Sequence, residues 1–333
     1  MKKLLKAIGV LALLLVAILC GALLYVKTAL PRVGEAQNIK VETSPERVER
    51  GHYLANCVTV CMDCHSTRDW TLFSGPIKPG TLGMGGEKFD RQYGFPGVYY
   101  SKNITPAGIR DYTDGELLRV ITTGVDRKGR AMFPVMPYHY YGRMDTEDIL
   151  SIIAYLRTLP ALENKVPDSQ SDFPMSLIIN TLPTKASPQK RPAMSDSLAY
   201  GHYLVNAAGC AECHTPVKQG QIIQELMYSG GREFSMGPMG VVRSANITPD
   251  AETGIGNWSR EFFVARFRSY SDSVGYQQQK VEPGMMQSVM PWTMYANMTE
   301  QDLNAMYTYL MSLKGMPNKV LKFEPGGAAA KEY

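Results

Sequence analysis

The sequence predicts a mainly α-helical protein in which an N-terminal transmembrane helix precedes two tandem helical modules. Three observations support this prediction: an apolar run near the N-terminus, a set of short motifs that occurs twice in the same order, and apolar residues at helical spacing near the end of each copy. The 333 residues, 44% hydrophobic and 20% charged, are sufficient for two folded domains and their connections.

The first element is the apolar run from Ala7 to Val26, which follows three lysines. As a helix, its 20 residues extend about 30 Å, the thickness of one hydrocarbon core. The run is long for the apolar part of a signal peptide, and no clear cleavage site follows it. We interpret residues 1–30 as a retained membrane anchor, with a cleaved signal as the alternative. The lysines place the N-terminus in the cytoplasm and the rest of the chain outside.

The charges lie unevenly along the chain. The whole sequence holds 35 Lys and Arg against 31 Asp and Glu, but residues 1–30 contain four lysines and no acid. The remainder is therefore balanced at 31 against 31. Because a basic surface is the main requirement for nucleic-acid binding, we expect no nucleic-acid partner.

Four short motifs occur twice. They are GHYL at 51–54 and 201–204, CxxCH at 61–65 and 210–214, NITP at 103–106 and 246–249, and Met-Pro-aromatic at 136–138 and 290–292. Their shared order indicates a duplicated module. The resulting division is a linker at 31–45, a first module at 46–160, a proline-rich linker at 161–194, a second module at 195–320 and a tail at 321–333.

Each module is expected to close with a helix, at 145–159 and at 299–313. The acids of DTED and TEQD fall in the first turn of each helix, where the helix dipole favours negative charge. The apolar residues of the first of these helices recur at helical spacing: Ile149, Ile152, Ile153, Leu156 and Leu159.

CMDCH at 61–65 and CAECH at 210–214 carry the chemistry. Two thiols three residues apart on a helical turn can each form a thioether with a vinyl group of haem, and the adjacent histidine can then ligate the iron. A redox CxxC or a zinc site is the alternative, but neither explains a histidine directly after both pairs. We therefore predict two covalently bound haems c. The predicted attachment residues are Cys61, Cys64, Cys210 and Cys213, and the predicted proximal ligands are His65 and His214.

Met136 and Met290 are the predicted sixth ligands of the iron. Both precede a proline and an aromatic residue, in a loop shortly before the final helix of the module. A thioether ligand raises the reduction potential and suits electron transfer.

The competing ligands are less favoured. Met144 and Met298 also match in the repeat, but they stand at the start of the final helix, where an apolar packing role is expected. His139 has no histidine counterpart in the second module. His52 and His202 lie on the helix that leads into CxxCH, so we expect interface or surface histidines.

The order GHYL, CxxCH, NITP, Met-Pro-aromatic and AYL resembles class I cytochromes c, in particular the cytochrome c subunits of membrane-bound dehydrogenases. The similarity is strongest at SANITPDAETGIGNWSREFF, residues 244–263, and covers most of residues 46–316. The resemblance implies two cytochrome c domains. It also implies electron transfer from a dehydrogenase catalytic subunit to an acceptor of the respiratory chain, with the haem domains in the periplasm and the anchor in a bacterial inner membrane.

Two other functions remain open: an electron-transfer subunit of a terminal oxidase, and a dihaem peroxidase. A peroxidase needs one haem with an open or displaceable sixth position, which a methionine in both modules disfavours. For Asn103 and Asn246 we expect hydrogen bonds to haem propionates, with turn formation as a nearly equal alternative. Cys57 has no counterpart in the second module, and a buried free thiol is the default expectation.

Overall fold

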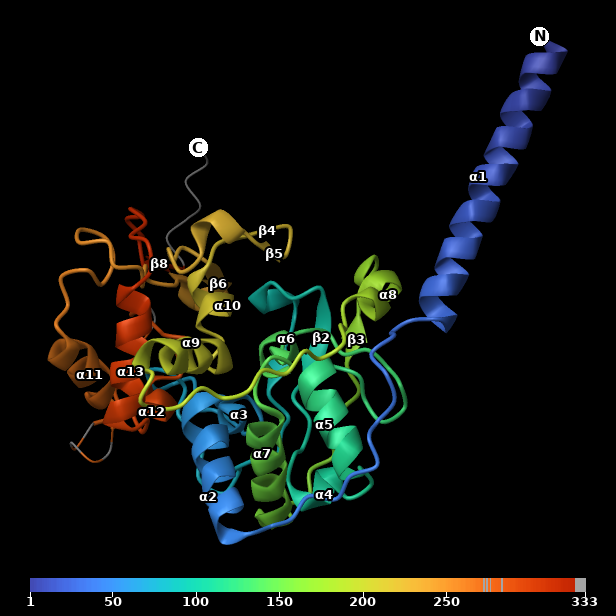
Figure 1. Cartoon of the computed structure of the whole chain (residues 1–333). Coiled ribbons are helices and arrows are strands. Elements are labelled where there is room, and N and C mark those ends of the chain that lie inside the picture. Colours follow the sequence, from blue (N-terminus) through green and yellow to red (C-terminus); the bar gives the residue numbers. More distant parts are fainter. Residues whose placement is uncertain (272, 274, 276, 283, 327–333) are drawn as a thin grey trace.

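The computed structural model describes residues 1–271, 273, 275, 277–282 and 284–326. Helix α1 (Lys2–Thr28) projects from one end of a body formed by the two modules, which lie side by side (Figure 1). No residue of α1 is buried, and its mean hydropathy is 2.9 over the most apolar window. By length and composition α1 can cross a membrane, a test that a signal sequence also passes.

The first module is mostly helical, as the sequence predicts. Its helices are α2 (Pro45–Tyr53), the π-helix η1 (Leu54–Val58), α3 (Cys61–Cys64), α4 (Pro106–Ile109), α5 (Asp114–Thr123), α6 (Tyr138–Tyr141) and α7 (Thr146–Thr158). Ser44 caps α2 ahead of Pro45, and Thr113 and Glu116 form a capping box on α5. Asp145 caps helix α7, which begins at Thr146, within one residue of the start that the sequence predicts.

The second module repeats this plan. Its helices are α9 (Ser197–Ala207), α10 (Cys210–His214), α11 (Arg260–Arg268), α12 (Trp292–Tyr295) and α13 (Glu300–Met311), with single 3-10 turns at η4 (Gln224–Leu226) and η5 (Gly237–Met239). Thr299 caps α13, with Glu300 and Asp302 in its first turn.

The first and last helices of each module cross at a glycine of the GHYL motif. A Cβ atom added to Gly51 would lie 1.8 Å from the carbonyl oxygen of Ser151, and one added to Gly201 would lie 2.0 Å from that of Ala305. Only glycine permits these contacts between α2 and α7 and between α9 and α13. The repeated GHYL is therefore explained in part by helix packing.

Short antiparallel strands were not expected from the sequence. They form sheets of order β1-β2-β3, β4-β5 and β6-β7-β8. The strands are β1 (Lys88–Phe89), β2 (Gly97–Tyr100), β3 (Gln170–Ser171), β4 (Val217–Lys218), β5 (Gln221–Ile222), β6 (Glu233–Ser235), β7 (Gly240–Arg243) and β8 (Phe323–Pro325). Each strand has two to four residues, which is too short for an alternating pattern of apolar and polar residues to be recognised in the sequence.

The connections at 161–194 and 321–333 both contribute strands that pair with the modules. Strand β3 lies in the linker at 161–194 and pairs with β2, and the linker also contains α8 (Met175–Ile178) and the 3-10 turn η3 (Ile179–Thr181). Strand β8 lies within 321–333 and pairs with β7, while residues 327–333 lie outside the described part of the chain. A further 3-10 turn, η2 (Arg91–Tyr93), joins β1 to β2.

Candidate haem-binding sites

Each CxxCH motif forms one helical turn that begins from a left-handed residue. The residue before Cys61 is Val60, with φ of 45°, and the residue before Cys210 is Gly209, with φ of 63°. A left-handed conformation is costly for a β-branched residue but not for glycine. The turn places both cysteines and the histidine of each motif on one short segment, which is the arrangement that covalent haem attachment requires.

The two motif histidines have matching hydrogen bonds. His65 Nδ1 lies 2.6 Å from the carbonyl oxygen of Lys102, and His214 Nδ1 lies 2.7 Å from that of Ala245. Because a carbonyl only accepts, Nδ1 carries the proton and Nε2 is the nitrogen with a lone pair for a metal. Burial lowers the pKa of both imidazoles, which favours the neutral form that binds iron.

The motif cysteines are free thiols, each partly buried. Burial raises the pKa of Cys64 and of Cys210 to about 12, and that of Cys213 to about 11. A redox-active CxxC needs a lowered thiol pKa, so these surroundings do not favour the redox alternative. Within the described ranges, no three His, Cys, Asp or Glu side chains are arranged to hold a metal ion. The donor set fits covalent haem.

Asn103 and Asn246 fix the loops that supply the two carbonyls. Asn103 Nδ2 donates to the carbonyl of Leu162 (2.7 Å), and its Oδ1 accepts from the backbone N–H of Thr105 (2.9 Å). Asn246 matches this geometry, donating to the carbonyl of Met316 (2.7 Å). These are the hydrogen bonds of a structural turn, the alternative that the sequence left open. Contact with haem propionates stays a prediction.

Met136 and Met290 occupy equivalent loops directly before α6 and α12. The carbonyl of Met136 accepts a hydrogen bond from the N–H of Tyr138, and that of Met290 from the N–H of Trp292, each at 2.8 Å. Both methionine side chains are half-buried against the core. Met144 and Met298 are buried instead, with 1% and 0% of their surface exposed. These two methionines fill the core, and ligation by Met136 and Met290 stays a prediction.

The loop that carries Met290 is held by the first module. Ser74 Oγ donates to the carbonyl of Met290 (2.5 Å) and accepts from the N–H of Trp292 (3.1 Å). Gln287, fully buried, accepts from the N–H of Ser74 (2.8 Å) and donates to the carbonyls of Trp70 and Leu72. Since residues 70–74 follow the first CxxCH, the second candidate site is built partly from the first module.

The acid between the motif cysteines is paired with an arginine in both modules. In the first, Arg68 donates to Asp63 (2.8 Å) and to Glu87 (3.0 Å), and all three side chains are largely buried. In the second, Arg232 pairs with Glu212 at 2.7 Å in a more exposed setting. The sequence analysis missed these pairs, although Asp63 and Glu212 occupy the same place in the two motifs.

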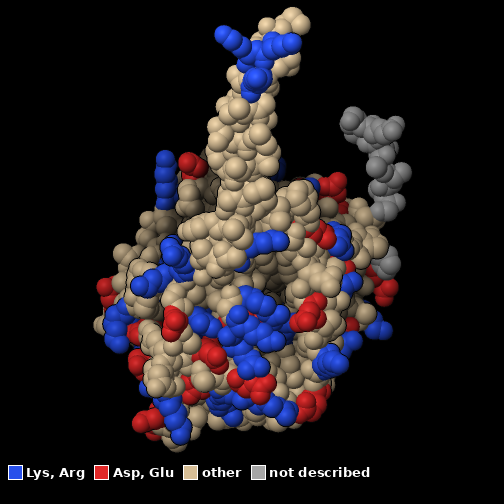
Figure 2. Space-filling view, turned by 90° about the vertical axis from the view of Figure 1, so that its right-hand side faces the viewer, with Lys and Arg blue, Asp and Glu red and all other residues tan. Residues whose placement is uncertain are grey.

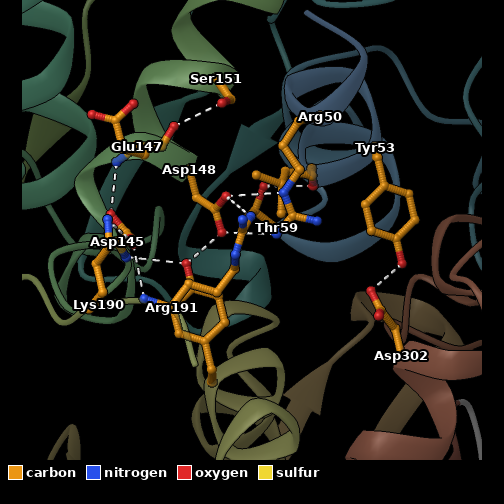
Figure 3. Close-up of polar contacts among 12 residues, drawn as sticks. Arg50, Tyr53, Thr59, Asp145, Glu147, Asp148, Ser151, Lys190, Arg191 and Asp302 are labelled. Carbon is orange, nitrogen blue, oxygen red and sulfur yellow. Dashed lines mark hydrogen bonds and ion pairs between the residues drawn. The ribbon is translucent and has the colours of Figure 1, made fainter. Parts of the chain in front are cut away.

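The modules dock through two equivalent tyrosine–aspartate contacts. The hydroxyl of Tyr53 donates to Asp302 Oδ2 at 2.6 Å, and that of Tyr203 donates to Asp148 Oδ2 at 2.7 Å. Both tyrosines come from GHYL, and both aspartates lie in the first turn of the final helix of the other module. Figure 3 shows Tyr53 pointing to Asp302, and Arg50 and Arg191 converging on Asp148. The docking is therefore reciprocal.

Buried tyrosines lie beside both motifs at this junction. The hydroxyl of Tyr141 donates to the carbonyl of Thr59, and that of Tyr295 to the carbonyl of Ala208, each at 2.8 Å. Burial raises the pKa of both phenols well above its usual value, and the Tyr295 phenol also interacts electrostatically with Tyr141. Helix α12 of the second module contacts η1, which precedes the first CxxCH segment, and α6 of the first module contacts α9, which precedes the second.

His52, His202 and Cys57 lie as the sequence predicts. His52 and His202 are exposed and contact Tyr155 and Tyr309, with ring centroids 5.1 and 4.8 Å apart. His139 is also exposed, on α6. Cys57 is a buried free thiol whose pKa is raised to about 11 by burial.

Comparison with known proteins assigns the family. Residues 198–314 match the family model described as cytochrome c. The second module therefore belongs to the cytochrome c family. The matched residues span most of the second module, and the first module repeats its motifs in the same order.

The curated relatives include cytochrome subunits of dehydrogenases. The chain is 27% identical over 284 residues to the cytochrome c subunit of the alcohol dehydrogenase (quinone) of Gluconobacter oxydans, covering 81% of this chain and 55% of the relative. It is 27% identical over 300 residues to the fructose dehydrogenase cytochrome subunit of Gluconobacter japonicus, covering 84% and 56%. The chain thus spans about half the length of these relatives.

A shorter relative is described as dihaem. The diheme cytochrome c-type protein of Cereibacter sphaeroides is 25% identical over 230 residues, covering 66% of this chain and 74% of the relative. This chain is thus a homologue of cytochrome subunits of dehydrogenases. The comparisons support a cytochrome c with covalently bound haem c that transfers electrons.

Proposed function

We propose that the protein is a membrane-tethered dihaem c-type cytochrome that passes electrons from a dehydrogenase catalytic subunit to an acceptor of the respiratory chain. The observation that carries this proposal is the duplicated site. Each module has a CxxCH turn whose histidine is held by a backbone carbonyl, and the two modules dock through equivalent contacts.

Haem c, when bound, supplies a one-electron couple at each site. The motif cysteines fix it covalently, and the hydrogen bonds of His65 and His214 set the ring orientation and the tautomer for ligation through Nε2. Met136 and Met290 are assigned as the sixth ligands. A histidine–methionine pair at both sites raises the potentials and leaves no open position, so it supports electron transfer in preference to peroxidase turnover.

The contacts between the modules hold the two sites at a fixed separation. The Tyr53 and Tyr203 hydroxyls bind buried carboxylates across the junction, and residues 70–74 bind the loop of Met290. Electrons that enter at one module then pass to the other across this junction, which suits a relay between two membrane-bound partners.

Helix α1 is assigned as a retained anchor in the bacterial inner membrane, with the haem modules in the periplasm. Its contacts with the body support retention: Asn180 Nδ2 donates to the carbonyl of Val26 at 3.1 Å, and α8 and η3 both contact α1. A tether restricts the modules to the membrane surface and raises their effective concentration near respiratory partners.

Mass spectrometry of the proteins that co-purify stoichiometrically in mild detergent tests the partner. A flavin, quinone-cofactor or molybdenum dehydrogenase subunit is the expected result and would name the substrate class. Oxidase subunits would favour the terminal oxidase alternative. Purification alone, with turnover of peroxide by an external electron donor, would replace the proposal with a dihaem peroxidase.

A further inference from the structure

The linker segment 173–182, FPMSLIINTL, lies against the base of α1. Helix α8 and the turn η3 both belong to it, and Figure 1 shows α8 beside the lower end of α1. The hydrogen bond from Asn180 to the carbonyl of Val26 fixes its level along α1. Val26 is the last residue of the apolar run. The segment therefore lies level with the point at which a spanning α1 leaves the hydrocarbon core.

The segment exposes apolar side chains and carries no charge of its own. Phe173 is 79% exposed and Ile178 is 44% exposed. The preceding Asp172 is compensated by Arg91, whose Nε donates to Asp172 Oδ2 at 2.6 Å. Figure 2 shows mainly uncharged surface directly below α1, with lysines and arginines gathered farther from the helix. An uncharged, apolar surface flanked by basic residues is typical of segments that lie in the membrane interface.

We infer that residues 173–182 form a second contact with the lipid bilayer, seated at the interface beside α1. The inference rests on the proposal that α1 is a retained anchor. The segment is joined to the first module by the pairing of β3 with β2 and by the hydrogen bond from the N–H of Asp172 to the carbonyl of Pro96 (2.9 Å). A bilayer contact at 173–182 therefore sets the orientation of the haem modules above the membrane, which a single helix with a flexible connection would not do.

Photo-crosslinking in proteoliposomes tests this contact on the full chain. The probe is a phospholipid with a diazirine in its acyl chain, and adducts are mapped by peptide mass spectrometry. We expect lipid adducts on α1 and on residues 173–182. Adducts on α1 alone would overturn the second contact but leave the anchor intact. Absence of adducts from α1 would instead overturn the anchor proposal, and the inference with it.

A matched pair of variants checks that the exposed apolar side chains mediate the contact. Phe173→Ser combined with Ile178→Ser is expected to lower the adduct yield at 173–182 several-fold, relative to the yield on α1 in the same sample. Phe262→Ser removes a comparably exposed phenylalanine on α11, away from α1, and is expected to leave both yields unchanged. Equal yields in all three proteins would contradict the inference. Circular dichroism verifies that each variant is folded.

Discussion

Replacing Arg68 by glutamine is expected to destabilise the first module strongly. The guanidinium neutralises Asp63 at 2.8 Å and Glu87 at 3.0 Å, and only 7% of the Arg68 side chain is exposed. It also lies over the indole of Trp70, with Cζ 4.3 Å from the ring centroid. Without it two carboxylates would remain in a largely dry site beside the first CxxCH motif.

The size of the expected loss of stability follows from the hydrogen bonds that Asp63 and Glu87 would keep. Glu87 keeps one hydrogen bond, from Trp70 Nε1 at 2.8 Å. Asp63 Oδ1 already lacks a hydrogen-bond partner among the residues that the structure describes. Removing one partner of a buried ion pair costs about 3–5 kcal/mol, because a buried charge is left uncompensated. Since domains are stable by only about 5–15 kcal/mol, the change is a large fraction of the total.

Urea unfolding of the purified proteins measures the loss. Arg243→Gln is the matched control: Arg243 also pairs with two acids, but Glu233 and Glu324 are well exposed, so a loss of about 0–1 kcal/mol is expected. Adding Asp63→Asn to the Arg68→Gln variant should recover part of the lost stability. The reasoning is refuted if Arg68→Gln loses no more stability than Arg243→Gln.

Further predictions concern the ligands, the junction, the pH dependence and a motif turn. Met136→Ala and Met290→Ala should each abolish one methionine-to-ferric-haem absorption band while the haem stays attached; unchanged spectra would redirect the assignment. Tyr203→Phe removes the hydroxyl that binds the first turn of α7, and should lower the free energy of unfolding by about 1–3 kcal/mol in denaturant titrations. Burial raises the pKa of Asp145, but hydrogen bonds and a nearby lysine outweigh it and hold that pKa below its usual value. Its stabilising effect is therefore present above about pH 4 and is lost at lower pH, so Asp145→Asn should flatten the pH dependence of stability there. Gly209→Ala should cost about 1–2 kcal/mol through the left-handed backbone alone, because an added Cβ meets nothing within 4 Å; an unchanged melting temperature would contradict this.

Local patterns predicted the local structure. The final helices expected at 145–159 and 299–313 are α7 and α13, because caps, acidic first turns and apolar spacing all lie within each segment. The CxxCH turns were equally visible. The burial of Met144 and Met298 followed from their place at the start of a final helix.

Contacts between distant segments were not predictable from one sequence. The carbonyl partner of His65 lies 37 residues along the chain, and that of His214 lies 31 residues along. The repeat of NITP indicated that this motif has the same role in both modules. It did not reveal that the carbonyl of the residue before NITP accepts a hydrogen bond from the histidine of CxxCH. Tyr53 and Asp302 are 249 residues apart, and their contact arises only when the modules dock. The repeat marked GHYL without revealing that its tyrosine joins the modules.

The number of haems per chain tests the central claim most directly. Intact mass spectrometry of the denatured protein counts covalently attached haem without depending on any partner, acceptor or activity. Two haems per chain are expected, with one lost in a variant carrying Cys61→Ala and Cys64→Ala and the other retained at Cys210 and Cys213. A single haem in the unsubstituted protein would contradict the account of two equivalent sites joined in one electron-transfer unit.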